Sequence, residues 1–319
     1  MKKNSLNLYK KQPVKETVSI IGVPFEEGSG ATGLATNPKY LRKCGIVKQL
    51  IQSGIEVVDN GDVFVKQSKS KDKKVLKQLA IEMAGVVSKK VETEISLGRR
   101  VLVFGGDHSI SLGTISGASI AKDKDIGVIW IDAHPDISTW EKSLTKNVHG
   151  MLVSSLLGVG DKGLVNILED GAKIKKKNVL YIGLKDMDDY EIDYLKKERI
   201  NVVTMFDVQN QGMNEVLNIV DKFSKRNKNI WVSMDMDSIQ KRYVPSSPMA
   251  TDEGFTPREI LNLARFIGRA ANVIGVDIVE MSSAGDTDKR TANLAIDLSA
   301  KLFGSDSGWY EGYMNEHKK

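Results

Sequence analysis

Cysteine is nearly absent from this 319-residue chain: Cys44 is the only one, so the sequence cannot form an intrachain disulfide. A reducing compartment fits this composition best, and we expect the cytoplasm. Hydrophobic runs long enough to span a membrane are also missing, and no apolar stretch follows the first lysines as it would in a secretory signal. The sequence therefore predicts a protein without a membrane partner.

Charge of one sign is not concentrated enough to suggest a nucleic-acid partner. The formal net charge of +5 comes largely from dispersed lysines, with clusters at the N-terminus and in "KQSKSKDKK" (66–74). Neither cluster is interleaved with aromatic residues or followed by a nucleic-acid-binding motif. We interpret both as solvated surface and expect no binding to nucleic acid.

Low-complexity linkers, repeats and breaks in composition are absent too, so we expect a single domain over residues 1–319, with residues 1–15 as a flexible N-terminal tail. Helical periodicity is present at 75–98 and 256–271, and the second segment opens with Thr256 and Pro257 in cap and first-turn positions. Between such segments lie eight short, nearly continuous apolar runs: 17–25, 55–63, 99–107, 126–134, 178–186, 200–208, 229–237 and 272–280. Continuous runs are typical of strands covered on both faces, so the pattern predicts an α/β three-layer sandwich around a mostly parallel sheet.

A glycine-rich stretch, "GSGATG" (28–33), follows the first predicted strand and matches the dinucleotide-binding fingerprint. Three features oppose a dinucleotide site. Glu26 and Glu27 would repel a pyrophosphate, and Pro38 interrupts the segment where the phosphate-binding helix should run. The second predicted strand also does not end in the acidic residue that the motif requires. We interpret the stretch as a flexible surface loop, with a dehydrogenase as the remote alternative.

Carboxylates and imidazoles gather just past the apolar part of four of these runs, in "FGGDHS", "IDAHPD", "SMDMDS" and "VDIVEM". Ligands of parallel sheets bind beyond the carboxyl ends of the strands. The chain has four histidines; His108, His134 and His149 lie in or beside these segments, and His317 lies in the C-terminal tail. In "IWIDAHPDIS" (129–138) an aspartate, a histidine and an aspartate alternate, and alternate residues of an extended segment point to one side. We expect these side chains to converge.

The converging set holds two imidazoles and four carboxylates: His108, Asp132, His134, Asp136, Asp235 and Asp237. Burying such groups without cations is costly, and a bound metal compensates. Carboxylates mixed with imidazoles suit Mn²⁺ better than a structural zinc site, although Fe²⁺, Co²⁺, Ni²⁺ and Zn²⁺ stay open on ligand type alone. Four carboxylates balance two divalent ions, and a bridged pair of ions acidifies a water molecule.

The ordered motifs "GGDHS" (105–109), "DAHPD" (132–136), "SMDMD" (233–237) and "GVDIVE" (275–280) resemble those of the ureohydrolases. This dimanganese family contains arginase, agmatinase, guanidinobutyrase and formimidoylglutamase, and the resemblance runs from about residue 17 to 303. It implies an eight-stranded α/β fold and hydrolysis of a guanidino carbon. It also implies that two Mn²⁺ ions are bound, one by His108, Asp132, Asp136 and Asp235, and the other by Asp132, His134, Asp235 and Asp237.

Two further stretches resemble arginase within this family. The segment "NPKYLRKCGIVKQLIQSGIEVVDNGDV" (37–63) is similar to the arginase N-terminal pattern, and "GLKDMDDYE" (183–191) to the loop near the substrate α-amino group, which maps to Asp188 and Glu191. The resemblance implies that the α-carboxylate is bound by Ser138, Thr145 and Asn147. It also implies homotrimers or homohexamers.

The implied reaction converts L-arginine to L-ornithine and urea by attack of a metal-bridging hydroxide. Glu280 would anchor the guanidinium by a charge-assisted hydrogen bond. Asp136 would pass a proton to the departing amine, and His149 would exchange protons with solvent.

Two departures from the arginase pattern leave specificity open. Ser138 replaces a usual asparagine, and "SIQKRYVPSSPMATDEG" (238–254) replaces the family's "GLDP" and "GTGTP" segments. A formimidoylglutamase, or an amidinohydrolase for another guanidino acid, is the alternative within the family. The alternative of another class is a catalytically impaired relative that serves as a metal-binding or regulatory subunit.

Overall fold

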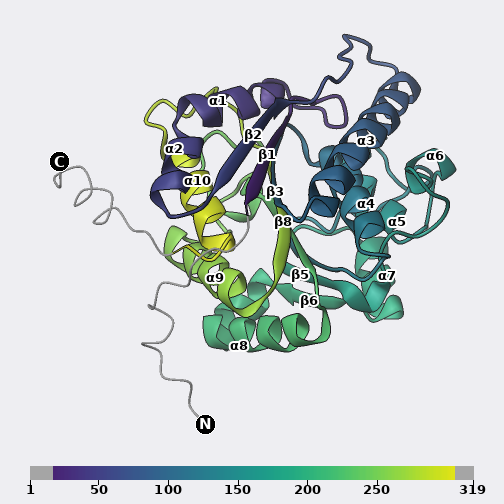
Figure 1. Cartoon of the computed structure of the whole chain (residues 1–319). Helices are drawn as coiled ribbons and strands as arrows, with labels where there is room; N and C mark the ends of the chain where they lie inside the picture. Colours follow the sequence, from purple (N-terminus) through teal and green to yellow (C-terminus); the bar gives the residue numbers. More distant parts are fainter. Residues whose placement is uncertain (1–16, 306–319) are drawn as a thin grey trace, which may run out of the picture.

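The structure, a computed structural model of the chain, describes residues 17–305 (Figure 1). Eight strands in this part form one sheet in the order β2-β1-β3-β8-β7-β4-β5-β6, and every neighbouring pair is parallel. The predicted eight-stranded α/β sandwich is confirmed. The strands are β1 (Val18–Val23), β2 (Val57–Asp62), β3 (Arg100–Gly105), β4 (Gly127–Ile131), β5 (Val179–Leu184), β6 (Asn201–Thr204), β7 (Ile230–Asp235) and β8 (Val273–Val279). The expected tail at residues 1–15 and His317 lie outside the described residues.

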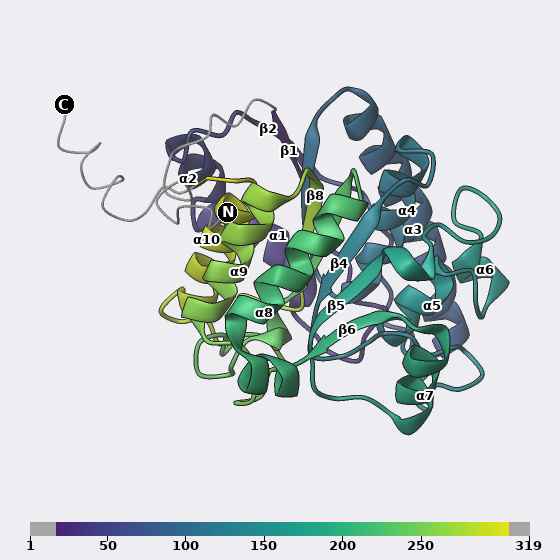
Figure 2. The same ribbon diagram turned by 90° about the horizontal axis from the view of Figure 1, so that it is seen from below.

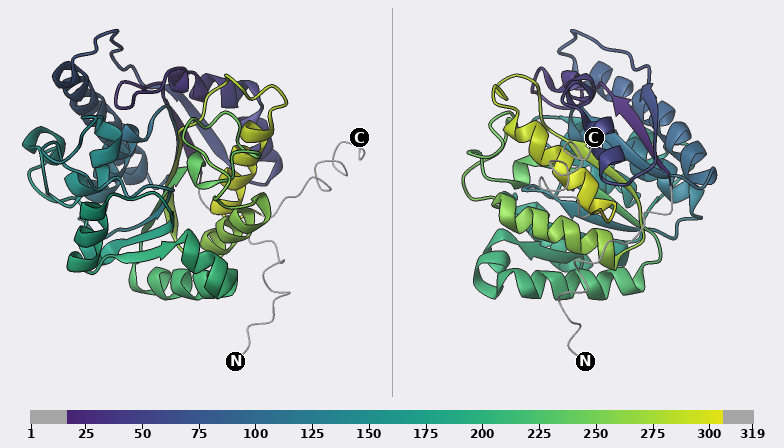
Figure 3. Two further views of the ribbon diagram at one scale, coloured as in Figure 1. Left: turned by 180° about the vertical axis from the view of Figure 1, so that it is seen from behind. Right: turned by 60° about the vertical axis from the view of Figure 1, so that its left-hand side comes forward.

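Helices cover both faces of the sheet, as Figures 1 and 2 show. One face is covered by α3 (Lys73–Ser96), α4 (Ser111–Ala121), α5 (Leu152–Leu156), α6 (Lys162–Val165) and α7 (Asp189–Glu198). The other is covered by α1 (Asn37–Lys43), α2 (Ile46–Gln52), α8 (Met205–Arg226), α9 (Pro257–Ala270) and α10 (Arg290–Leu302). In the right-hand view of Figure 3, α8, α9 and α10 lie side by side, from green to yellow. None of the helices within residues 17–305 is long and apolar enough to cross a membrane.

Two apolar cores result, one on each face of the sheet. Successive strand residues alternate between them: Ile20 packs in one core and Ile21 in the other. The large side chains of Trp130 and Trp231 are fully buried in the core beneath α3 and α4. Each strand therefore needs apolar residues on both sides, which is why the runs in the sequence are continuous rather than alternating.

Helix boundaries follow capping signals in the sequence. Asp72 caps α3 by accepting a hydrogen bond from the backbone N–H of Lys74. Thr256 caps α9 and Pro257 occupies its first turn, as predicted. The predicted strand at 200–208 is wrong in its second half, because β6 ends at Thr204. The Thr204 side chain accepts a hydrogen bond from the backbone N–H of Asp207 and begins α8.

The interpretation of "GSGATG" as a flexible surface loop is also wrong for its first residues. Gly28 and Ser29 are buried, and the backbone N–H of Ser29 donates to Asp107 Oδ2 at 2.8 Å. A Cβ atom at Gly28 would lie 2.3 Å from Ser109 Oγ, so only glycine fits this contact. The segment is packed against the loop after β3.

The strand order places the four sequence motifs side by side. The strands β3, β8, β7 and β4 are consecutive neighbours in the middle of the sheet. Because all are parallel, their carboxyl ends lie along one edge, and the segments that follow them meet there.

Candidate active site

The six side chains expected to bind metal meet at the carboxyl edge of these central strands. His108 begins a short 3-10 helix (His108–Ile110) after β3, and Asp235 ends β7 with Asp237 in the 3-10 helix that follows (Met236–Ser238). Asp132, His134 and Asp136 lie in the loop after β4. Their convergence therefore comes from three separate segments of the chain.

The reason expected for the convergence after β4 is wrong, although the residues do converge. The strand ends at Ile131, so Asp132, His134 and Asp136 do not alternate along an extended segment. Asp136 has φ 47°, in the left-handed region, and Glu280 after β8 has φ 58°. Non-glycine residues in this region store backbone strain, which persists where the surrounding structure enforces it and is common at active sites.

One group of ligand atoms surrounds His108 Nδ1. This nitrogen lies 3.1 Å from Asp132 Oδ2, 3.4 Å from Asp136 Oδ2 and 3.0 Å from Asp235 Oδ2. The imidazole stacks on Trp130, with ring centroids 4.3 Å apart. Trp130 in turn donates from Nε1 to Asp132 Oδ2 at 2.9 Å.

A second group surrounds His134 Nδ1, which lies 3.0 Å from Asp237 Oδ2 and 3.5 Å from Asp132 Oδ1. Asp132 thus contributes one oxygen to each group. On the other side of the ring, His134 Nε2 lies 3.6 Å from Asp186 Oδ2. Each group offers three ligand atoms within 4.8 Å of one another: His108, Asp132 and Asp136 in the first, and Asp132, His134 and Asp237 in the second.

The donor set fits divalent cations, because His108 is arranged to present a lone pair. Its Nε2 lies 2.8 Å from Ser233 Oγ, whose proton is donated to the Asp277 carboxylate. Ser233 must therefore accept from Nε2–H, which leaves Nδ1 as the ligand atom that faces the carboxylates. Such outer hydrogen bonds are typical of metal-binding histidines.

Electrostatics also favour a cation. Burial raises the pKa of Asp136 to about 8, and the charge of Asp132 adds to this effect. Burial, with the charges of Asp237 and Asp132, raises the pKa of Asp235 well above its ordinary value. Burial would also raise the pKa of Asp132, but hydrogen bonds with His108 and His134 hold it below its usual range. The buried acids carry more negative charge than the imidazoles offset, so protons or metal ions bind there.

Glu280 and His149 form a pair beside these two groups. His149 Nδ1 lies 3.2 Å from Glu280 Oε1, which also accepts the backbone N–H of His108 at 2.9 Å. Burial would lower the pKa of His149, but the hydrogen bond and charge of Glu280 raise it to about 9.

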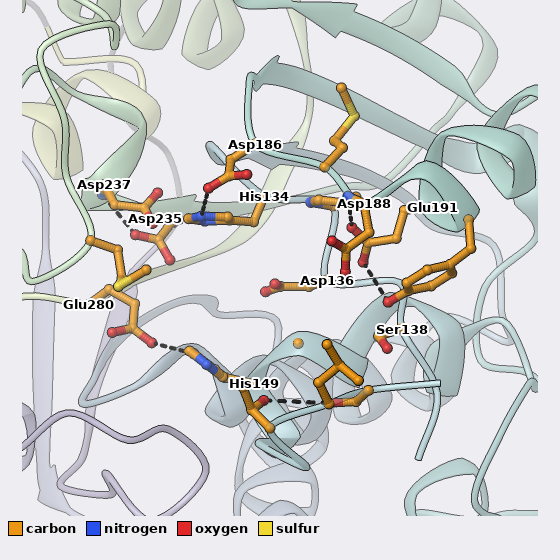
Figure 4. A pocket seen from close by; sticks show the side chains of 18 residues that line it. His134, Asp136, Ser138, His149, Asp186, Asp188, Glu191, Asp235, Asp237 and Glu280 are labelled. Atoms are coloured by element: carbon orange, nitrogen blue, oxygen red, sulfur yellow. Dashed lines mark hydrogen bonds and ion pairs between the residues drawn. The ribbon is translucent and has the colours of Figure 1, made fainter. Parts of the chain in front are cut away.

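One cavity of about 320 Å³ connects these groups to the surface (Figure 4). Asp235, Asp237, Glu280 and His149 lie at one end, and Ser138, Asp188 and Glu191 face the other. Seven carboxylates line it: Asp136, Asp186, Asp188, Glu191, Asp235, Asp237 and Glu280.

The residues expected to bind an amino-acid head group are only partly brought together. Ser138, Thr145, Asp188 and Glu191 line the cavity, and Asn147 does not. The Asn147 side chain instead accepts a hydrogen bond from Lys73 Nζ. Glu191 is buried and accepts the backbone N–H of Asp188 at 3.0 Å, so it also caps α7.

The divergent segment 238–254 folds back on itself and contributes Met249 to the cavity wall. Gln240 N–H donates to Phe255 O at 3.0 Å, and Lys241 Nζ donates to Ser247 O at 2.6 Å. Met249 is 53% exposed, so an apolar side chain borders the cavity mouth there.

Comparison with known proteins agrees with this geometry. A family model described as "Arginase family" matches residues 16–304. The chain belongs to the arginase family. It is 31% identical to an arginase of Bacillus subtilis over 291 residues, which covers 91% of this chain and 98% of that protein. It is 32% identical over 297 residues to an arginase of Brevibacillus brevis, which covers 91% and 99%. A crystal structure of arginase from Bacillus cereus superposes with a TM-score of 0.85 at 31% identity, covering 92% of this chain and all of that one.

Membership in the arginase family makes the chain a metal-dependent hydrolase that acts on small guanidino compounds. The clustered histidines and aspartates are therefore its candidate metal-binding site. A formimidoylglutamase structure from Bacillus subtilis shares the fold at 21% identity, with a TM-score of 0.74.

Several side chains at the site were not found by sequence reasoning. Ser233 and Asp277 hold His108, and Tyr190 lines the cavity. Ser233 and Asp277 stand inside quoted motifs, but their apolar surroundings gave no sign that they face one another. Tyr190 directly precedes Glu191, and this position next to a predicted substrate-binding residue could have pointed to it.

Proposed function

We propose that the chain hydrolyses L-arginine to L-ornithine and urea with two bound Mn²⁺ ions. The observation that carries this proposal is a single cavity with acidic groups at both ends (Figure 4). A substrate with a guanidinium at one end and an ammonium group at the other would match this arrangement of charge.

We assign the metal ligands from the two groups of donor atoms. His108, Asp132, Asp136 and Asp235 would hold one ion, and Asp132, His134, Asp235 and Asp237 the other. Two ions so held would acidify a water molecule and supply hydroxide at neutral pH. The intact geometry of both groups argues against a purely regulatory relative.

Glu280 would bind the guanidinium. Glu280 is 3% exposed, lies at the proposed metal end of the cavity and already accepts two hydrogen bonds at Oε1. A charge-assisted hydrogen bond from its second oxygen would orient the guanidino carbon, and orientation lowers the barrier. Asp136 would carry a proton to the departing amine, and His149, 28% exposed in its side chain, would exchange protons with solvent.

The head group of the amino acid would occupy the outer end. Asp188 and Glu191 would bind the α-ammonium group, and Ser138 and Thr145 would donate to the α-carboxylate. Asn147 would join them only if its side chain turned away from Lys73.

The experiment is a substrate panel for the full chain loaded with Mn²⁺. We expect urea and ornithine in equal amounts from L-arginine, at a higher kcat/KM than for agmatine or 4-guanidinobutyrate, and little formamide from formimidoylglutamate. A higher kcat/KM for another substrate would reassign the specificity. Bound Mn²⁺ without turnover of any substrate would favour a binding or regulatory protein.

We further propose a single domain that works as a homotrimer or homohexamer in the cytoplasm. The large family match over residues 16–304 supports one domain. Sedimentation of the full chain would measure the assembly, and a monomer at micromolar concentration would contradict it.

A further inference from the structure

Tyr190 lies between the two sets of side chains at the outer end of the cavity. It is the second residue of α7, is half-buried and lines the cavity together with Ser138 and Glu191. Its hydroxyl group lies 3.4 Å from Glu191 Oε1 and also interacts with the Ser138 side chain. Figure 4 shows Ser138 and Glu191 facing this region from different elements. One phenol therefore reaches both the acidic side and the hydroxyl side of the outer cavity.

The outer cavity offers little to attract a substrate carboxylate. Seven carboxylates line the whole cavity, and within residues 17–305 no lysine or arginine side chain is among its lining groups. The protonated His149 and the proposed cations lie at the other end of the cavity, so a carboxylate in the outer end must be held by uncharged donors.

Two such donors are the hydroxyl groups of Ser138 and Thr145. Ser138 Oγ lies 3.4 Å from Thr139 O and also interacts with the Tyr190 hydroxyl group. Thr145 Oγ1 lies 3.4 Å from Ser143 Oγ and accepts the backbone N–H of Asn147 at 3.3 Å. The 3.4 Å contacts are weak, and a carboxylate is a stronger acceptor than a neutral hydroxyl or carbonyl oxygen, so both groups can turn their protons to a ligand. Tyr190 is the third hydroxyl group in the same region, and its bond to Glu191 is equally long.

We propose that Tyr190 is a specificity-determining residue whose hydroxyl group donates a hydrogen bond to the carboxylate of an amino-acid substrate. The inference rests on the proposed hydrolysis of arginine. When the carboxylate is bound, the phenol donates to it instead of to Glu191. Glu191 then keeps the backbone N–H of Asp188 and is free to accept from the substrate ammonium group.

The phenol is suited to this role across the working pH range. Burial raises the pKa of Tyr190 to about 12, although its contact with Ser138 opposes the rise. The hydroxyl group therefore stays protonated and acts as a donor at neutral pH.

The test compares Tyr190→Phe with a matched variant, Tyr194→Phe. Tyr194 is one turn further along α7, and its buried hydroxyl group has no hydrogen-bond partner in the described part of the chain. For the Mn²⁺-loaded protein we expect Tyr190→Phe to raise the KM for L-arginine about tenfold more than the KM for agmatine, which has the amine but no carboxylate. We expect Tyr194→Phe to change neither KM. Equal changes for both substrates, or none, would overturn the proposal.

Binding of the proposed product, L-ornithine, tests the role of Tyr190 independently of turnover. Calorimetry of the Mn²⁺-loaded proteins measures dissociation of L-ornithine and of putrescine, which lacks the carboxylate. We expect Tyr190→Phe to weaken ornithine binding about tenfold and putrescine binding much less. If wild type hydrolyses none of the guanidino substrates, the proposed function fails, and a selective loss of ornithine binding would still support Tyr190. Equal ornithine affinity in wild type and Tyr190→Phe, or no ornithine binding at all, would overturn it.

Discussion

His108 is joined to Asp277 through a single hydroxyl group. The Nε2 atom of His108 lies 2.8 Å from Ser233 Oγ, and Ser233 Oγ lies 2.5 Å from Asp277 Oδ1. The buried Asp277 carboxylate also accepts hydrogen bonds from Trp231, Ser111 and Thr114. Because a carboxylate accepts only, the direction of each proton in this chain is fixed. His108 is thereby oriented before any metal binds.

Removal of this link should weaken metal binding. We expect Ser233→Ala to raise the dissociation constant for Mn²⁺ about tenfold or more, since Nε2 loses its acceptor and the ring its fixed orientation. Calorimetric titration with Mn²⁺ measures the change. Ser116→Ala is the control, because Ser116 Oγ is buried on α4 without a hydrogen-bond partner in residues 17–305. Equal affinities in wild type and Ser233→Ala would show that the link does not orient the ligand.

Metal binding should release protons and weaken as the pH falls. In the metal-free protein the pKa of Asp136 is about 8, raised first by burial and then by Asp132. Burial would lower the pKa of His108, yet hydrogen bonds with Asp132 and Asp235 raise it well above its ordinary value. Both groups hold a proton at pH 7 that a cation must displace. Each released proton makes the affinity for Mn²⁺ rise about tenfold per pH unit below the pKa.

Titrations at pH 6, 7 and 8, in buffers of different ionisation enthalpy, measure this release. We expect the release of at least one proton per metal site at pH 7, and an affinity for Mn²⁺ that increases from pH 6 to pH 8. An affinity that is flat over this range would contradict the protonation of the metal-free site.

The charge of Glu280 should matter more for turnover than for metal binding. Glu280→Gln keeps an oxygen able to accept from the His108 backbone N–H but removes the negative charge that we propose binds the guanidinium. We expect kcat/KM for L-arginine to fall about 100-fold or more, as for other losses of a buried charge partner, about 3 kcal/mol. The dissociation constant for Mn²⁺ should change only a few-fold. If the affinity for Mn²⁺ fell in parallel with kcat/KM, Glu280 would belong to the metal site instead.

The sequence was sufficient for the fold and for the neighbourhood of the candidate metal ligands. Continuous apolar runs identify buried parallel strands, and His108, Asp132 and Asp235 lie at or just beyond the ends of such strands. The local backbone was not predictable in the same way. The left-handed conformation of Asp136 arises from tertiary contacts after β4, and no pattern in "IDAHPDIS" signals it.

Contacts between distant segments could not be predicted from the sequence either. The resemblance to arginase implied that Asn147 binds the carboxylate of the substrate together with Ser138 and Thr145. The structure turns its side chain to Lys73 on α3, 74 residues earlier in the chain. Neither periodicity nor a motif can predict this hydrogen bond, because the contact leaves the local sequence pattern of both segments unchanged.

Lys173 shows the same limit in the lysine-rich stretch "KIKKKN" (173–178), where any lysine is expected to be exposed. Its side chain is 1% exposed, and Nζ donates to three backbone carbonyl groups, those of Val165, Glu169 and Gly171, at 2.7–2.8 Å. The ammonium group therefore holds the loop after α6 in place. Without it, these carbonyl groups would lose their partner, at a cost of about 1–3 kcal/mol for each one left unsatisfied.

We expect Lys173→Met to lower the free energy of unfolding by about 2 kcal/mol or more, because methionine fills the volume but donates no hydrogen bond. Urea denaturation at pH 7, followed by circular dichroism, measures the loss. Lys175→Met, at an exposed position two residues away, should change the value by less than about 0.5 kcal/mol. If both variants were as stable as wild type, water would satisfy the three carbonyl groups equally well, and the buried ammonium group would not stabilise the loop.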